Sequence, residues 1–277
     1  MSRDNGRVSD RMPTEARNAR ATRLGSLDTR AILELMNDED ATVPGAVRRA
    51  LPQIQRAVDA VVDAVRAGGR VRYVGAGTSG RLGVLDASEW PPTFGVPRDL
   101  ARGIVAGGDR ALRESVEGAE DDPSAGERDA RATARRGDVV VGISASGRAR
   151  YVVAALDAAR TLGARAVAVT CDAGSPLAAA AEIAIAVDVG PEIVAGSSRL
   201  KAGTATKLVL NMLSTASMIR LGRTRDDLMA DLRAVNAKLR GRAVAIVATE
   251  ARVSEEEARG RLERAQWDVR KAISGSE

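Results

Sequence analysis

The stretch Val71-Arg-Tyr-Val-Gly-Ala-Gly-Thr-Ser-Gly-Arg-Leu-Gly-Val-Leu-Asp-Ala-Ser-Glu-Trp-Pro-Pro92 decides the fold of this 277-residue chain. It opens with a β-branched and aromatic run that is typical of a strand. A loop of glycine and hydroxyl residues follows, and then a helix-compatible segment that ends at Glu89, before two prolines. Because backbone N–H groups point out of such a turn and the helix dipole favours negative charge, the stretch predicts an anion site. The carboxylate of Glu89 lies farther along the same segment.

Strand-like runs alternate with helix-like runs after this point. The expected strands cover residues 71–75, 103–106, 138–143, 166–170 and 182–187. The expected helices cover residues 82–88, 109–116, 123–134, 151–162 and 176–181. This alternation predicts an α/β fold with a doubly wound, mostly parallel sheet and helices on both faces. Sheets of this kind bind ligands at the carboxyl ends of their strands.

Helical patterns precede the predicted sheet. Up to about Arg23 the chain is polar and is expected to form an extended arm. Helical spacing follows over residues 27–36 and 43–66, and Pro52 marks a bend or a new helix start.

Helices are also expected after the sheet. A loop rich in Gly and Ser at 191–203 leads to helices over 204–221 and from 225 to about 248. Ser254 has the N-cap pattern of a further helix, in a stretch that resembles two short helices of a ubiquitin-associated-like bundle. We expect three parts: an N-terminal arm with helices over 1–65, the α/β domain over 66–224, and C-terminal helices over 225–277.

The absence of histidine excludes several kinds of catalytic site. The chain has no His and one Cys, Cys171, so it has no Ser-His-Asp triad, no Cys-His pair, no His-ligated zinc and no disulfide within the chain. Proton transfer near neutral pH then falls to carboxylates, Lys, Tyr or water, and two carboxylates are the natural pair. Cys171 follows an apolar run and is expected to be a buried small residue.

The net charge of +5 at pH 7 comes mainly from scattered arginines. No dense basic run occurs, and the chain has only 2 Trp, 2 Tyr and 1 Phe to stack on bases, so we expect no nucleic-acid partner. The first residues lack the apolar core of a signal peptide, and no stretch approaches the roughly 20 apolar residues of a membrane helix. We therefore expect no membrane partner and a cytoplasmic location.

Two further segments repeat the pattern of strand, hydroxyl-rich turn and helix. One is Ser144-Ala-Ser-Gly-Arg-Ala-Arg150, and the other is Gly196-Ser-Ser-Arg-Leu-Lys-Ala-Gly-Thr204. A single such segment is often an ordinary turn or a capped loop, but their repetition at strand ends favours a phosphate site. The acidic run 116–122 is a second carboxylate candidate, or else a solvated helix end.

These motifs resemble those of the N-acetylmuramic acid 6-phosphate etherases. The resemblance rests on Gly75-Ala-Gly-Thr-Ser-Gly-Arg-Leu-Gly-Val-Leu-Asp-Ala-Ser-Glu89, Val116-Glu-Gly-Ala-Glu-Asp121, Ser146-Gly-Arg148, Ser198-Arg-Leu-Lys-Ala-Gly-Thr204 and Asn236-Ala-Lys-Leu239, with others in the same order. It runs from about Thr14 to the C-terminus and implies a sugar isomerase (SIS) fold.

The resemblance also implies a reaction. Such enzymes cleave the ether between the sugar and D-lactate by elimination and then hydration, giving N-acetylglucosamine 6-phosphate, without a metal or an organic cofactor. The two functional glutamates of the family fall on Glu89, as the acid for the leaving lactate, and on Glu120; which of them removes the C2 proton is open. An acid working near neutral pH needs burial, so we expect Glu89 to be partly desolvated. The expected partners are a small sugar phosphate and a second copy of the chain, as a homodimer.

The segments above supply the expected binding residues. The residues that we expect to bind the substrate and its phosphate are Gly77, Thr78, Ser79, Gly80, Arg81, Ser144, Ser146, Gly147, Arg148, Ser197, Ser198 and Lys201, and no metal ligand is expected.

The chain departs from the pattern of the family at three places. Trp90 stands where a small residue is usual, Ala149 and Arg150 replace Thr-Pro, and Ala19 replaces Pro. One alternative is a non-catalytic, sugar-phosphate-binding regulatory protein of the same fold, which the presence of both glutamates disfavours. The other is a DNA-binding regulator, which would need a helix-turn-helix that the sequence lacks.

Overall fold

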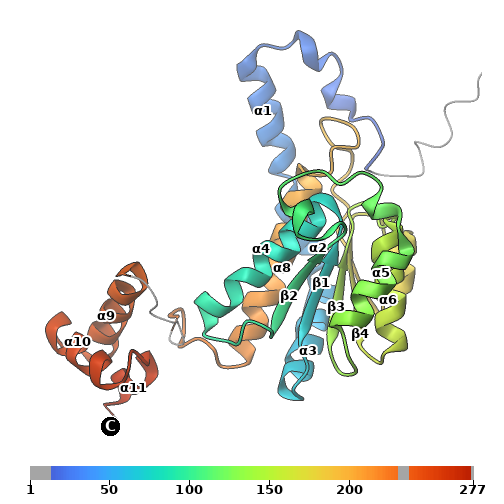
Figure 1. The fold of residues 1–277 in the computed structure, drawn as a ribbon. Coiled ribbons are helices and arrows are strands. Elements are labelled where there is room, and N and C mark those ends of the chain that lie inside the picture. Colours follow the sequence, from blue (N-terminus) through green and yellow to red (C-terminus); the bar gives the residue numbers. More distant parts are fainter. Residues whose placement is uncertain (1–13, 230–236, 276–277) are drawn as a thin grey trace, which may run out of the picture.

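The computed structural model describes residues 14–229 and 237–275, and a five-stranded parallel sheet forms its centre (Figure 1). The strands are β1 Val71–Gly75, β2 Ala101–Val105, β3 Val139–Ile143, β4 Arg165–Thr170 and β5 Ile183–Ala186. They lie in the order β2-β1-β3-β4-β5, and every pairing is parallel. The predicted α/β fold and all of its expected strands are confirmed.

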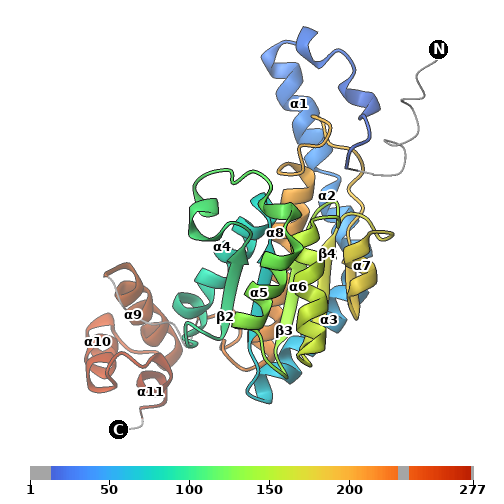
Figure 2. The same cartoon turned by 45° about the vertical axis from the view of Figure 1, so that its right-hand side comes forward.

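Helices cover both faces of the sheet (Figures 1 and 2). One face packs against α3 Leu51–Arg66, α4 Gly77–Phe94 and α8 Lys201–Arg220. The other face packs against α5 Pro123–Thr133, α6 Arg150–Thr161 and α7 Pro176–Ala180.

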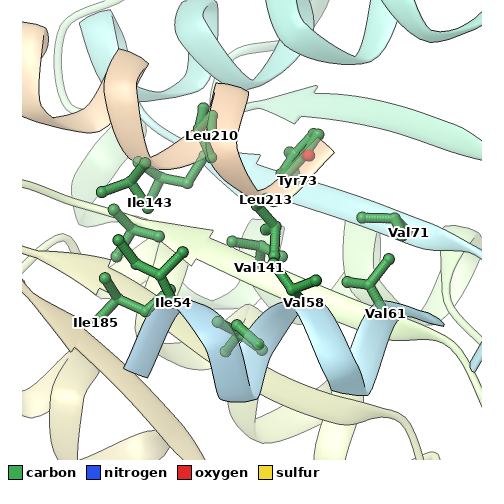
Figure 3. Packing of buried hydrophobic residues seen from close by; sticks show 14 of the residues in the cluster. Ile54, Val58, Val61, Val71, Tyr73, Val141, Ile143, Ile185, Leu210 and Leu213 are labelled. Atoms are coloured by element: carbon green, nitrogen blue, oxygen red, sulfur yellow. The ribbon is translucent and has the colours of Figure 1, made fainter. Parts of the chain in front are cut away.

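Alternation along the buried strands builds the two cores. In β3, Val139, Val141 and Ile143 belong to one buried cluster, whereas Val140 belongs to the other, because successive side chains point to opposite faces. Both faces of the sheet are covered, so the central strand β3 is apolar and buried along its whole length. Figure 3 shows the first cluster, in which side chains of α3 and α8 meet those of β1, β3 and β5.

The strand order places a topological switch point between β1 and β3. From β1 the chain moves outward to β2, and it then returns to continue on the other side from β3. Doubly wound sheets bind their ligands at such a switch point, outside the carboxyl ends of the strands. Gly75 pairs with Ile143 at these ends, so the segments that begin at Ala76 and Ser144 start side by side.

Over residues 14–23 the chain is not the expected extended arm, and residues 1–13 of that expectation lie outside the described residues. Residues 19–21 and 24–26 form short 3-10 turns, and Thr14 and Asn18 are buried. Helix α1 Thr29–Asp40 extends away from the sheet (Figure 1), whereas α2 Val43–Arg49 packs into the core. The polar pattern misled the prediction because Asn18 caps its own turn and donates to a partner far along the chain.

Pro52 marks a new helix start, as one of the two readings of its pattern expected. It lies in the first turn of α3, where the missing N–H costs no hydrogen bond. Helix α3 packs directly on the sheet, although the expected boundary at residue 65 separates the two. The division of the chain at 65 and 224 stays a prediction.

Three C-terminal helices share a core of their own. Helices α9 Ala237–Ala251, α10 Glu255–Arg264 and α11 Val269–Ser274 enclose a third apolar cluster and lie beside the sheet domain (Figure 2). The Ser254 N-cap is confirmed, because its hydroxyl accepts from the Glu257 N–H at 3.2 Å. The expected helix from residue 225 is wrong at its start: Arg225 and Leu228 pair across a tight turn in which Asp226 has a positive φ.

The helix expected over 109–116 is also wrong. Only a 3-10 turn, Gly108–Leu112, forms there, since Gly107 and Gly108 are in left-handed conformations, and Ala111 is its one buried residue. In the described ranges, we find no helix with the length and apolar character needed to cross a membrane.

Candidate active site

The first glycine- and hydroxyl-rich segment forms the first turn of α4, where a loop was expected. The helix begins at Gly77, directly after β1. A side chain at Gly80 would meet the Gly75 carbonyl oxygen at 2.7 Å, so only glycine permits so abrupt a turn. No side chain caps this helix within the described residues, which leaves the N–H groups of Thr78 and Ser79 at the switch point.

The second segment is a loop, as expected, between β3 and α6. Ser144 is buried, and the Ser146 hydroxyl accepts from the Arg148 N–H at 3.3 Å. Gly147 has φ +65°, and a Cβ there would lie 2.1 Å from the Ser175 hydroxyl. Gly147 therefore shapes the loop and supplies no side chain to a ligand.

The third segment meets the first. A Cβ placed on Gly203, in the first turn of α8, would lie 3.8 Å from the methyl carbon of Thr78 and 3.6 Å from the Ser198 carbonyl oxygen. Ser197 and Ser198 precede this turn and are partly exposed. The sheet places the second segment beside the first, so the three segments surround one edge of the sheet.

The three predicted cationic ligands are already paired in the structure. Arg81 donates to the carbonyl oxygens of Ala111 and Glu114, each at 2.9 Å, and Arg148 pairs with Asp172 at 3.3 Å. Lys201 is buried, and its Nζ lies 2.6 Å from a carboxylate oxygen of Glu39. Arg148 nevertheless stays exposed, so the hydroxyl and backbone N–H groups of the predicted phosphate site share its exposed part with this one guanidinium.

A buried polar cluster supports the third segment. Glu39 accepts from Lys201 and from the Asn18 amide at 2.9 Å, and Arg20 adds a third contact at 3.1 Å. Burial alone would raise the pKa of the Glu39 carboxyl, but its hydrogen bonds and ion pairs, with Lys201 first, outweigh burial and lower this pKa. Buried Glu192 accepts hydrogen bonds from the Lys201 and Ala202 N–H groups, each at 3.0 Å, and so caps the N-terminus of α8.

Replacing Lys201 is expected to reduce stability strongly. A Lys201→Met variant leaves buried Glu39 without its closest cation, and breaking a buried pair in this way costs about 3 kcal/mol. Because the folded-state pKa of Glu39 lies below its ordinary 4.5, this stabilisation is complete above that pH and is lost as the pH falls through the folded value.

Urea unfolding of Lys201→Met beside Lys207→Met, a change at an exposed lysine of the same helix, measures the effect. The gap between the two variants should narrow as the pH is lowered below 4.5. Equal stability of the two at neutral pH would contradict the structural role of the pair.

Glu120 lies in the loop that joins β2 to α5. It is exposed in the 3-10 turn Ala119–Asp121, and Ala119 packs against the apolar cluster that includes Ala149, next to the second segment. Arg81 holds the earlier part of the same loop through its two carbonyl contacts. These contacts place the acidic run 116–122 next to the second segment, at the switch point.

Glu89 is exposed, against the expectation of partial burial. It lies on the solvent side of α4, whereas Asp86 and Trp90 take the buried side. At 1.5 Å of rise per residue, the ten residues from Ser79 place Glu89 about 15 Å down the helix. The expected end of the helix at Glu89 is wrong as well, since α4 continues through both prolines to Phe94.

Sequence reasoning missed the buried acids around the site. Asp86, Glu39 and Glu192 each accept several hydrogen bonds in the interior, and no local pattern singled them out. Cys171 is buried as expected; burial raises the pKa of its thiol to about 12, helped by the charges of Glu192 and Asp188.

Two domain models match the chain. The SIS domain model matches residues 119–216, and the model of the glucokinase regulatory protein N-terminal SIS domain matches residues 53–160. Among solved structures, the phosphoheptose isomerases of Neisseria gonorrhoeae and Francisella tularensis align with TM-scores of 0.53 and 0.52. Their sequence identities are 18% and 19%, over 69% and 70% of this chain and 98% and 100% of theirs, which shows a shared fold.

Curated relatives are similar over most of the chain. A protein of Brucella anthropi named N-acetylmuramic acid 6-phosphate etherase is 56% identical over 86% of this chain and 78% of its own length. Proteins with the same name from Symbiobacterium thermophilum and Actinobacillus succinogenes are each 52% identical over 95% of this chain. The matches cover 88% and 86% of those two proteins.

Proposed function

The chain belongs to the family of N-acetylmuramic acid 6-phosphate etherases, and from that premise we propose how its residues carry out the reaction. As a carbon–oxygen lyase, it cleaves the D-lactyl ether of N-acetylmuramic acid 6-phosphate to give N-acetylglucosamine 6-phosphate and D-lactate. The identity of 56% over 86% of the chain carries this assignment, which favours an enzyme over a non-catalytic regulatory protein of the same fold.

The proposed route is elimination followed by addition of water. In the ring-opened sugar, the aldehyde at C1 acidifies the C2 proton, which Glu120 removes as general base. The C3–O bond then breaks, and Glu89 gives its proton to the departing lactate oxygen. Water adds to C3 of the unsaturated aldehyde and a proton returns to C2, so the sum is one water consumed for each ether cleaved.

The phosphate is proposed to lie among the three converging segments. Ser79, Ser146 and Ser198 offer hydroxyl donors, and the first turn of α4 offers N–H groups. Lys201 and Arg81 support the site without contacting the phosphate. Lys201 holds the start of α8 through Glu39, and Arg81 holds the loop 106–122. Gly77, Gly80 and Gly147 let the backbone approach the ligand closely.

Removing a single hydroxyl from this site should weaken binding of the phosphorylated sugar. Ser79→Ala and Ser146→Ala are each expected to lower kcat/KM for N-acetylmuramic acid 6-phosphate by about 10-fold, since a hydrogen bond to a charged group contributes about 1.5 kcal/mol. The residual rate on unphosphorylated N-acetylmuramic acid should stay the same. Steady-state kinetics on both sugars tests this, and equal losses would mean that the hydroxyls only hold the segments together.

We propose that the complete site forms between two copies of the chain. Glu89 lies about 15 Å from Ser79 along one helix, which exceeds the length of a hexose phosphate. In an isologous dimer, Glu89 of one protomer can face the phosphate site and Glu120 of its partner. Burial of Glu89 at that contact would supply the desolvation that the single chain lacks.

Mixing two inactive variants tests the shared site. When Glu89→Gln and Glu120→Gln subunits are mixed and allowed to exchange, each mixed dimer regains one intact site, giving roughly a quarter of the original activity with random pairing. Each variant alone, carried through the same exchange, is the control. No recovery despite proven subunit exchange would place both glutamates of a site on one protomer.

We propose a cytoplasmic reaction that needs no cofactor. Over residues 14–229 and 237–275, no group of three or more metal-ligating side chains is found. The carboxylate chemistry above is complete without a Lewis acid. Activity should therefore survive dialysis against EDTA, and a loss that one specific metal restores would contradict the proposal.

A further inference from the structure

Asp86 is a buried carboxylate on α4, one helical turn before Glu89. It is 7% exposed and accepts four hydrogen bonds from three elements. The donors are the Tyr73 hydroxyl of β1 at 3.0 Å, the Trp90 indole N–H of α4 at 3.1 Å, and from α8 the Asn211 amide at 2.9 Å and the Ser214 hydroxyl at 3.1 Å.

These bonds make the position of Asp86 highly determined. A buried carboxylate is costly unless its oxygens are satisfied, and here all four donors are neutral groups that each make a charge-assisted bond. Burial, together with the charge of Asp86, raises the pKa of the Tyr73 hydroxyl, which keeps Tyr73 a donor. The carboxylate thus ties α4 to the sheet and to α8.

The backbone of α4 is weakest just after Glu89. Pro91 and Pro92 have no N–H, so the helical bonds to the carbonyl groups of Ala87 and Ser88 are missing. The helix nevertheless continues to Phe94. Trp90 is 1% exposed and anchors this turn. Its indole N–H bonds to Asp86, so the two residues that are joined lie on either side of Glu89 in the sequence.

We propose that Asp86, through its bond to Trp90, is a positioning residue that fixes the direction in which Glu89 leaves the helix. The bond between the Asp86 and Trp90 side chains holds the turn that carries the proposed acid. It compensates for the two backbone hydrogen bonds that Pro91 and Pro92 cannot make. This role rests on the proposed function of Glu89. It also gives a reason for the large Trp90 at a place where the family pattern usually has a small residue.

Two variants separate positioning from stability. Trp90→Phe keeps an aromatic ring and removes the indole N–H that donates to Asp86. Ser214→Ala removes another donor to the same carboxylate and leaves the bond between Asp86 and Trp90 in place. In deuterium oxide, one reaction mixture reports both deuterium exchange at C2 of the remaining substrate and D-lactate release. Thermal unfolding of both variants is measured alongside.

Trp90→Phe should lower lactate release by about 10-fold relative to C2 exchange, with KM unchanged, because small misplacements of a catalytic group are costly. Ser214→Ala should lower Tm but leave the ratio of release to exchange unchanged. Asp86→Asn, which turns an amide N–H₂ toward the donors, should lower the ratio further.

A Trp90→Phe variant with an unchanged ratio would overturn the proposal, as would one in which release and exchange fall together. A wild-type chain that releases no lactate would instead refute the proposed function, so the two failures are distinguishable.

Discussion

Glu89→Gln is expected to reduce D-lactate release by at least about 100-fold, the lower range for loss of a general acid. The amide keeps the size of the side chain but has no proton to give to the leaving oxygen. Glu89 is exposed on α4 in the single chain, so the fold of the protomer should be retained in Glu89→Gln, as circular dichroism checks. Initial rates of lactate release at saturating substrate measure the effect.

Glu117→Gln is the matched control for this change, because it removes another exposed carboxylate, from the acidic run that also carries Glu120. It should keep the original rate. The acid role of Glu89 is refuted if Glu89→Gln retains a rate close to that of the control. A substrate whose leaving group needs no proton offers a second test. If Glu89→Gln still acts on such a substrate, the result supports the role further, since only the protonation step is lost.

Glu120→Gln is expected to abolish a different step. Without the general base, exchange of the C2 proton should fall by about 100-fold or more, and lactate release should fall with it because elimination follows deprotonation. Nuclear magnetic resonance of the substrate recovered from deuterium oxide measures the exchange directly.

The two glutamate variants should therefore differ in one readout. Glu89→Gln retains exchange at C2 and loses release, whereas Glu120→Gln loses both. Exchange that persists in Glu120→Gln and vanishes in Glu89→Gln would reverse the two assignments while leaving the reaction class intact.

Much of the fold was predictable because its signals are local. The predicted strand runs are rich in β-branched apolar residues, and each supplies buried residues to the two clusters of the core. The sheet type predicted that the segments of Ser79 and Ser146 begin at the carboxyl ends of strands. The strand order, and with it the switch point between β1 and β3, came only from the structure. The reaction was predicted from the resemblance to the etherase family, which runs over most of the chain. Periodicity and composition alone do not identify the reaction.

What could not be predicted depends on contacts far apart in the sequence. The sequence predicts Lys201 as a phosphate ligand, but its charge is paired with Glu39, 162 residues away. The local rule for proline predicts a helix end before Pro91, because it takes no account of the bond that holds Trp90 to Asp86. Exposure of Glu89 likewise became apparent only when the buried face of α4 was defined by tertiary packing.

The most direct measurement follows both products of N-acetylmuramic acid 6-phosphate in water enriched in oxygen-18. Elimination and hydration predict that the full chain releases D-lactate that keeps its original ether oxygen. The label should enter N-acetylglucosamine 6-phosphate at C3, as read by mass spectrometry of the separated products. Label in the hydroxyl group of the lactate, or no lactate at all, would contradict the account.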